Sequence, residues 1–441
     1  MSIPVSLTSI PDSLLDRDAF LSGLLSRVTT KKSDGWLQDL RDGAANWVRH
    51  SVIPNTREEE WRFTDLSPLK QVDFNNVGTI HELSLQDDFV LPEVSERLVF
   101  VNGVYSPNLS NTENLPAGLK VGNLDVLPDE ITKEYLAQSE GAKEVFTALN
   151  TAALNDVAVI WVAKNVVVET PIHLLFVSVS GESATISQPR VLVVAESSSQ
   201  VVLIEEYTNH RDTEEEVYFT NGVTEIWVNE NAQVSHNRIV REGAAAFHVG
   251  KTAVTQARYS RYNCNAVTVG GKMSRHNLEI LQTGEQTETT LNGLTVIADN
   301  QLADTHSALS LNHPHGVSKQ LHKCIIGDRA HGVFNGKVFV PKPAQLTNAS
   351  QLNRNLLLSS KSRIDTKPQL EITADNVKCA HGATVSQLED DQIFYLQSRG
   401  IEENDARKLL VNAFATEIIN FIPVPSLRES LLKTVTSLTN K

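Results

Sequence analysis

Cysteine is scarce in this 441-residue sequence, and its scarcity argues against two kinds of protein. The three cysteines, Cys264, Cys324 and Cys379, are far apart, odd in number and form no CxxC pair. A disulfide framework and a structural zinc site built from cysteine alone are therefore disfavoured. A reducing compartment fits best, so a cytoplasmic location is predicted.

Long apolar runs and an excess of basic charge are also absent. The densest apolar stretch, VAVIWVA at residues 157–163, is far shorter than the ~20 residues that a membrane-spanning helix needs. The first residues, MSIPVSLTSIPDSLLDRD, lack the basic start and apolar stretch of a signal peptide. With 53 acidic and 39 basic residues the net charge is −14, which leaves no basic face in bulk. We expect neither a membrane nor a nucleic acid as partner.

A nucleotide-binding loop is missing too. The nearest lookalike, GVFNGKV at residues 332–338, has three residues between its glycines where a P-loop needs four, and Val338 where Ser or Thr would hold the metal. GxGxxG, GxSxG and HExxH motifs do not occur. The chain is poorly equipped to be an enzyme by itself, so a non-catalytic role is predicted.

Hydrophobic periodicity divides the chain into three expected regions: a helical or mixed region at 1–150, a β region at 151–383 and a helical region at 384–441. In the first region, apolar residues at helical spacing predict helices over 14–28 and 37–48, with Ser33 and Asp34 as caps of the second, and another helix around 129–149. Asn102 and Gly103 predict a hairpin turn within 98–107.

Over residues 155–378 short Val- and Ile-rich runs alternate with small polar turns, which is typical of strands. A sandwich, a barrel and a parallel β-helix are all compatible with this pattern. We favour the β-helix, because polar residues enter the strands freely, as stacked turns with a narrow interior allow. Turns of ~20–25 residues would give about ten coils, although no strict period is visible.

The last region returns to helical periodicity. Ser386 with Glu389, and Ser426 with Glu429, match the capping-box pattern and predict two helix starts, and Gly400 is placed to end the first of these helices. Between them an apolar stripe runs from residue 406 to 421 and is stopped by prolines. The stripe either packs against the β region or offers a face to a partner, and both interpretations stay open.

Two groups of residues could bind metal. The first group lies between positions 306 and 331, and its possible ligands are His306, His313, His315, His322, Cys324 and His331. The simpler interpretation of this group is that the histidines lie on a solvated strand face and that Cys324 is a buried apolar thiol.

The second group is KCAHGAT at 378–384. On a strand, Cys379 and His381 would face the same way, and thiolate and imidazole are ligands that iron and iron–sulfur clusters accept. Gly382 would allow close backbone approach or a positive φ. Two ligands make only half a site, and on spacing alone an incidental pair at a strand end is the favoured interpretation.

Three segments resemble one known family. They are QLHKCIIGDRAHGVFNGKVFV, AQLTNASQLNRNLLLSS and TKPQLEITADNVKCAHGATVSQLEDDQIFYLQSRGIEENDARKLLVNAF, and REEEWRFTDL at 57–66 resembles the same family. It is the SufB/SufD family of iron–sulfur cluster assembly proteins, and the KCxHGAT form resembles its SufD branch rather than the EHEA-like sequence typical of SufB. Ser386 stands where Gly is expected, and Asp375-Asn376 where two acidic residues are expected; neither departure alters the thiol or the imidazole.

The resemblance implies a mainly β fold, a right-handed parallel β-helix flanked by N- and C-terminal helices. It implies a scaffold subunit of a SufBCD complex that forms a heterodimer with SufB and docks the SufC ATPase through the helices of 384–441. It places His381, with Cys379 less securely, at the SufB interface as candidate ligands or acid–base groups for a nascent, transient iron–sulfur cluster. No stably bound cofactor is implied, and nothing follows about a flavin.

The main alternative is a purely structural interaction module without a cluster ligand of its own. A carbohydrate-active β-helix enzyme would need clustered carboxylates on one strand face, which the sequence does not offer. Whether the isolated chain pairs with a second copy of itself through the face meant for SufB is left open.

Overall fold

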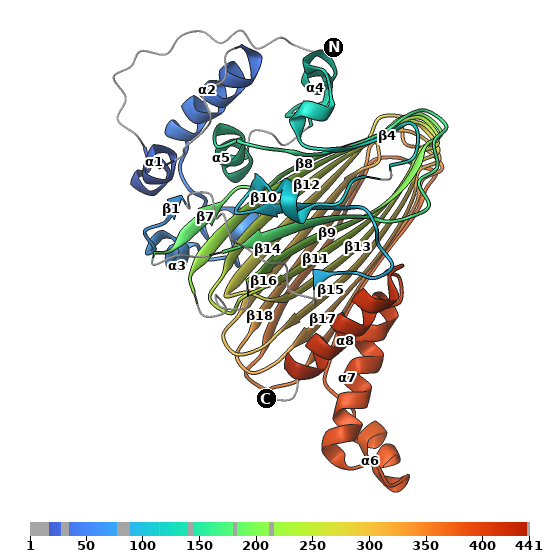
Figure 1. Ribbon diagram of the computed structural model, residues 1–441. Coiled ribbons are helices and arrows are strands. Elements are labelled where there is room, and N and C mark those ends of the chain that lie inside the picture. The colour runs from blue at the N-terminus through green and yellow to red at the C-terminus, as the bar shows by residue number, and fades with distance from the viewer. Residues whose placement is uncertain are drawn as a thin grey trace.

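Parallel strands that alternate between two sheets form the body of the molecule (Figure 1). This computed structural model describes residues 17–27, 35–76, 89–113, 115–139, 144–179, 183–210 and 216–438. From β8 onward, even-numbered strands pair in one sheet and odd-numbered strands in the other, so each turn of chain adds one strand to each sheet. The result is a parallel β-helix of about eight turns with helices at both ends of the chain. The predicted fold is confirmed, and the sandwich and barrel alternatives are wrong.

We call the two sheets A and B. In stacking order sheet A contains β4 (Leu119–Gly122), β5 (Ala158–Val162), β8 (Arg190–Ala195), β10 (Tyr218–Val228), β12 (Phe247–Gln256), β14 (Met273–Gln282), β16 (Leu302–Ser310), β18 (His331–Val340) and β20 (Arg363–Ile372), with β7 (Thr185–Ser187) beside β10 and β1 (Asn75–Asn76) beside β7. Sheet B contains β3 (Val104–Tyr105), β2 (Arg97–Val101), β6 (Ile172–Ser178), β9 (Gln200–Asn209), β11 (Gln233–Glu242), β13 (Arg261–Gly270), β15 (Glu288–Ile297), β17 (Val317–Ile326), β19 (Asn348–Leu357) and β21 (Lys378–Ser386).

One turn of the β-helix takes 26 to 33 residues. Arg190 pairs with Val223, 33 positions on, and Lys251 pairs with Asn277, 26 positions on. The expectation of shorter turns and about ten coils is therefore wrong. Most strands of the stack are nine to eleven residues long on both sheets, because polar residues that interrupt the apolar runs in the sequence still belong to strands.

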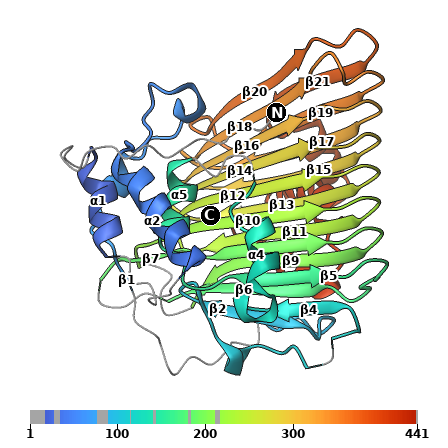
Figure 2. The ribbon, with the colours of Figure 1, turned by 90° about the horizontal axis from the view of Figure 1, so that it is seen from above.

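The two ends of the stack differ (Figure 2). At the beginning, β3 and β4 run antiparallel to β2 and β5 and close the first turn. The β2–β3 turn uses Asn102 and Gly103 at φ 49° and 80°, which confirms the predicted hairpin. At the other end, β20 and β21 follow the parallel pattern, and no described strand covers them.

Helices cover the outer face of each sheet. Sheet A carries the N-terminal group α1 (Ala19–Ser26), α2 (Trp36–Arg49), α3 (Ser67–Lys70), α4 (Asp129–Tyr135) and α5 (Val145–Ala152), with the short 3-10 turns η1 (Glu59–Trp61), η3 (Pro107–Leu109) and η4 (Leu124–Val126) elsewhere in the N-terminal region. Sheet B carries α7 (Glu403–Ile419) and α8 (Pro425–Leu438), and α6 (Asp390–Ser398) precedes them. The predicted stripe of residues 406–421 is divided between the two predicted interpretations. Ala406 and Ile418 are buried, whereas Leu409, Ala413 and Phe421 are exposed to solvent.

The helices of the structure differ from the predicted helices in several details. The single helix expected around 129–149 is two helices, α4 and α5. Both predicted capping boxes are wrong, because Ser386 still belongs to β21 and Ser426 lies inside α8. Gly400, at φ 86°, lies just beyond the end of α6. Residues 14 and 28 and the proposed caps Ser33 and Asp34 lie outside the described residues.

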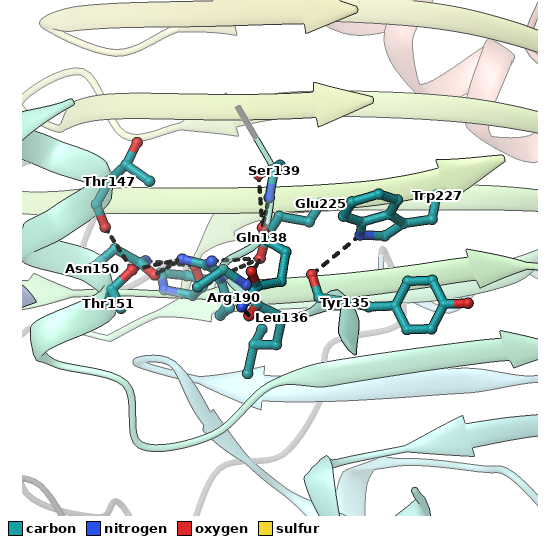
Figure 3. Close-up of polar contacts among 12 residues, drawn as sticks. Tyr135, Leu136, Gln138, Ser139, Thr147, Asn150, Thr151, Arg190, Glu225 and Trp227 are labelled. Carbon is teal, nitrogen blue, oxygen red and sulfur yellow. Dashed lines mark hydrogen bonds and ion pairs between the residues drawn. The ribbon is translucent and has the colours of Figure 1, made fainter. Parts of the chain in front are cut away.

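A buried ion pair fastens α4 and α5 to sheet A (Figure 3). Arg190 of β8 and Glu225 of β10 are each 1% exposed, and their side chains meet at 2.5 Å. The Arg190 guanidinium also donates to the side chain of Asn150 on α5, and Glu225 accepts from the backbone and hydroxyl of Ser139 after α4. Because every charge is compensated within the cluster, we regard it as structural.

Candidate functional site

The open end of the stack is an exposed strand edge. Among the described strands, β20 pairs only with β18 and β21 only with β19. Every residue of β21 except Cys379 and Gly382 is exposed. Since unpaired backbone groups at a strand edge are a template for another chain, this end is suited to contact a second protein.

Cys379 and His381 lie on this terminal strand. Cys379 pairs in register with Ala349 and His381 with Gln351 of β19. Both side chains belong to the face of β21 that looks toward the interior of the β-helix; Cys379 is half-buried against the apolar core, whereas His381 is exposed. The predicted common face is confirmed, and the imidazole is open to a neighbouring chain because none of the described later residues forms a turn of the β-helix over it.

The thiol of Cys379 differs from a reactive surface cysteine. Burial raises the pKa of Cys379, and a hydrogen bond with the backbone of Ala349 only partly opposes this. The thiol is therefore protonated at neutral pH and would need a metal or a base to become a ligand. Gly382 does not have the positive φ that the sequence suggested; an added Cβ there would lie 3.4 Å from Leu352, which is ordinary contact.

The described residues contain no group of three or more His, Cys, Asp or Glu side chains able to hold a metal ion. Cys379 and His381 are thus without a third such ligand in the part of the chain that the structure describes. Whether the pair is half of a metal site stays a prediction. A metal or cluster at this end would need further ligands from another molecule.

The histidines between 306 and 331 do not form one site. His306 lies on the outer face of sheet A and His322 points into the interior, while His313 and His315 occupy a turn rather than a strand. His331 pairs with Asp365 at 2.7 Å. The described residues form no metal site at this cluster, because its side chains point to opposite faces of the strands or lie in a turn, which favours the simpler interpretation given for it.

The interpretation of Cys324 as a buried apolar thiol is confirmed. Its side chain is 1% exposed and packs with Ile297, Ala303 and Ala330. Burial raises the pKa of Cys324 to about 12. Burial likewise lowers the pKa of its neighbour on the same face, His322, to about 4, so that this imidazole is neutral. Neither group is prepared for metal chemistry by an opposing charge.

The segment REEEWRFTDL fastens the N-terminal region to the outer face of sheet A near the open end. The Trp61 ring lies 3.9 Å from the Arg275 guanidinium, and Thr64 donates to Asp304 beneath it. Glu59 pairs with Lys367 of the terminal strand β20. The segment therefore braces one of the two strands that form the exposed edge.

His306 belongs to the same attachment. It meets Asp304 at 3.0 Å and Glu60 at 3.1 Å. Although burial opposes ionisation, Arg275 and His306 lower the pKa of Asp304 to about 2. The charged groups on this face are thus paired with one another.

A chain of polar side chains inside the β-helix was missed by sequence reasoning. Glu205 lies between His236 at 3.0 Å and Arg238 at 3.5 Å, and Arg238 donates to His248, which meets Glu242. All five are at most 6% exposed. Burial opposes its ionisation, but His236 and Arg238 lower the pKa of Glu205 to about 2. The signal in the sequence is only that His236, Arg238 and Glu242 lie at even spacings within the β11 segment, and it becomes interpretable once the inward face is known.

The C-terminal helices are tied to the strands next to the open end. Lys323 of β17 donates to the backbone carbonyl of Phe414 at 2.9 Å and pairs with Glu417 of α7, with its amine 4.1 Å from the Phe414 ring. Arg354 of β19 reaches the same carboxylate at 3.5 Å. A displacement of α7 would therefore act directly on β17 and β19, and β19 is the strand that pairs with β21.

Another part of the C-terminal region is left uncovered. On α6, Phe394 is 70% exposed and Tyr395 58% exposed, and Leu409 of α7 is 50% exposed. Exposed aromatic residues gathered on one element are a feature of protein–protein contact sites. Part of the tail thus buries its apolar residues on the β-helix, and part of it offers them to solvent.

Comparison with known proteins agrees with this arrangement. The model of the SUF system FeS cluster assembly SufBD core domain matches residues 176–414, and the model of the SufBD protein N-terminal region matches residues 25–174. An iron–sulfur cluster assembly SufBD family protein of Synechocystis is 48% identical over 412 residues, 91% of each chain. The iron–sulfur cluster assembly protein SufD of Escherichia coli is 32% identical over 386 residues, 86% of this chain and 88% of its own. SufD of Bacillus subtilis is 25% identical over 418 residues, 91% of this chain and 93% of its own.

The two family models together match residues 25–174 and 176–414, which include nearly all of the β-helix, and they identify the chain as an iron–sulfur cluster assembly protein. The chain belongs to the SufBD family, and the family resemblance drawn from its sequence is confirmed. No helix among the described residues is long and apolar enough to cross a membrane.

Proposed function

We propose that this chain is the SufD-type scaffold subunit of a SufBCD complex. Its open edge at β20 and β21 pairs with a SufB-type subunit, and His381, with Cys379 beside it, contributes to a nascent iron–sulfur cluster that SufB ligands complete. The observation that carries the proposal is the exposed imidazole of His381 on a terminal strand that is free to pair. The cluster is cargo under construction and is passed on.

The second half of the proposal concerns the ATPase. The uncovered aromatic residues of α6 dock a SufC subunit, which supplies the nucleotide chemistry that this sequence lacks. Nucleotide-driven association of two SufC copies moves the C-terminal helices, and the contact of Lys323 with Glu417 passes that motion to β17. A two-state element driven by nucleotide is an established type of switch.

The test is cluster formation in the complex assembled from this full chain with its SufB and SufC subunits. His381→Ala should abolish most of the cluster, measured as bound iron, sulfide and visible absorbance, while the complex still assembles. Cys379→Ala should cause a smaller loss, because its thiol is protonated and partly buried. The matched control is His315→Asn, which removes another exposed histidine and keeps a residue that tolerates the positive φ of this turn.

The alternative is a module that only holds its partners. In that case the His381→Ala complex would bind as much iron and sulfide as the wild type.

The isolated chain, with the same edge free, is expected to pair with a second copy of itself, and sedimentation of the purified chain measures this. A cytoplasmic location stays a prediction.

A further inference from the structure

Beneath His381 lies a column of glutamine amides. Gln320, Gln351 and His381 occupy matching positions of β17, β19 and β21. Neighbouring strands in a sheet are about 4.8 Å apart, so the three side chains follow one another along the inner face. His381 is the last member of the column and the only exposed one.

The hydrogen bonds of this column run away from His381. The Gln351 Nε2 donates to Gln320 Oε1 at 2.7 Å, and Gln320 Nε2 donates to the hydroxyl of Ser307 at 2.8 Å. One amide oxygen of the column is left over. Gln351 Oε1 is buried and has no hydrogen-bond partner among the described residues.

The Gln351 amide is also locked in place. Its side chain is 2% exposed and crosses the interior to Gly336 of the opposite sheet, where an added Cβ would lie 2.1 Å from Gln351 Nε2. An alanine at position 336 would therefore displace the amide. A buried acceptor that is held in one place and unpaired is uncommon, because an unsatisfied buried oxygen costs about 1–3 kcal/mol.

We infer that Gln351 is a positioning residue for His381. No hydrogen bond joins the two described side chains, but rotation of the exposed imidazole toward its register neighbour lets the unpartnered Gln351 Oε1 accept the N–H of one ring nitrogen, which directs the other nitrogen out of the open end. Histidines that bind metals generally donate their second ring N–H to an oxygen acceptor, which fixes the tautomer and the ring orientation. The inference rests on the proposed function for its purpose, but the hydrogen bond itself belongs to this chain alone. The glutamine column would then give a ligand on an exposed terminal strand one defined direction.

The decisive measurement is made on the isolated full-length chain with ¹³C- and ¹⁵N-labelled histidine side chains. The His381 resonances are assigned by their loss in His381→Ala, and their ¹⁵N shifts report the tautomer. In the wild type one tautomer should dominate. Gln351→Met, which keeps the volume and removes the acceptor, should return His381 to the tautomer mixture of a free imidazole. Gln320→Met is the matched control, since it removes a buried amide of the same column but leaves Gln351 Oε1 in place, and should leave one tautomer dominant.

Activity adds a second readout. In the assembled complex Gln351→Met should weaken iron binding about 10- to 100-fold, the range found when second-layer partners of metal ligands are removed, and the Gln320→Met complex should stay closer to the wild type. The inference is overturned if wild-type His381 shows a free-imidazole tautomer mixture, a result that needs no variant to fold. A dominant tautomer that Gln351→Met leaves unchanged also overturns it. If the tautomer depends on Gln351 while His381→Ala still builds a full cluster, the positioning stands and the proposed function fails.

Discussion

Replacing Phe394 and Tyr395 of α6 by serine should weaken the proposed docking of a SufC-type ATPase subunit on this chain. The two residues are 70% and 58% exposed. An aromatic residue presents about 200 Å², and burial contributes about 25 cal/mol per Å², so complete burial of either exposed part is worth about 3 kcal/mol. The two residues together would contribute about 6 kcal/mol, and ordering the interface offsets about half of that sum. The double variant should therefore lose about 3 kcal/mol of binding free energy, which is about a 100-fold rise in Kd.

The assay is titration calorimetry of the full chain with the SufC subunit, under one salt condition. The matched control is Tyr259→Asn, which removes an exposed aromatic residue from a turn of the β-helix while keeping a residue that tolerates φ 60°. The α6 variant should keep the wild-type unfolding midpoint, since Phe394 and Tyr395 are largely solvated. Wild-type affinity in the double variant would refute the docking surface, and an equal loss in the control would show a general effect of surface aromatic residues.

Three further predictions test how the molecule is held together. Glu225→Gln leaves the buried Arg190 guanidinium without its charged partner, which costs about 3–5 kcal/mol of unfolding free energy. Since the unfolding entropy of a chain of this size is about 0.9 kcal/mol/K, calorimetry should show an unfolding midpoint lowered by about 3–5 °C. An unchanged midpoint would contradict the structural role of the pair. Burial disfavours the charged form of His236, but the Glu205 carboxylate raises its pKa to about 9. The charged pair therefore contributes fully to the free energy of unfolding below the ordinary histidine pKa of 6.5, and this contribution is lost as the pH rises through 9. The difference in urea midpoint between wild type and His236→Gln should shrink over that range. Lys323→Met should leave SufC affinity within about twofold but reduce ATP-stimulated cluster formation about fivefold, which corresponds to a coupling free energy of about 1 kcal/mol. An unchanged ATP effect would show that the contact of Lys323 with Glu417 does not transmit the motion of α7 to β17.

The sequence predicts the class of fold because strand chemistry and turn chemistry are local. Asn102-Gly103 is sufficient to place the hairpin, and the Val- and Ile-rich runs are sufficient to place the strands. The length of a turn is not visible, because Arg238 and His236 sit within a strand whose inner face is polar, and a polar inner face removes the alternation by which strand ends are recognised.

The candidate site is predictable only in part. The two-residue spacing of Cys379 and His381 fixes their common face once a strand is assumed, and the structure has that strand. Their position on the last turn depends on how many turns follow, which is a property of the whole stack. Gln351 is thirty positions before His381, and only the register of β19 with β21 brings the two together.

The antiparallel strands β3 and β4 have a consequence for assembly. A rod whose two ends both offered parallel edges would add copies at either end and grow into a fibre. Here the first turn ends in β3 and β4, of only two and four residues, whereas β20 and β21 offer ten and nine residues, so an added strand finds far more backbone to pair with at one terminus. Such a difference in edge length favours a pair of fixed polarity over a growing fibre.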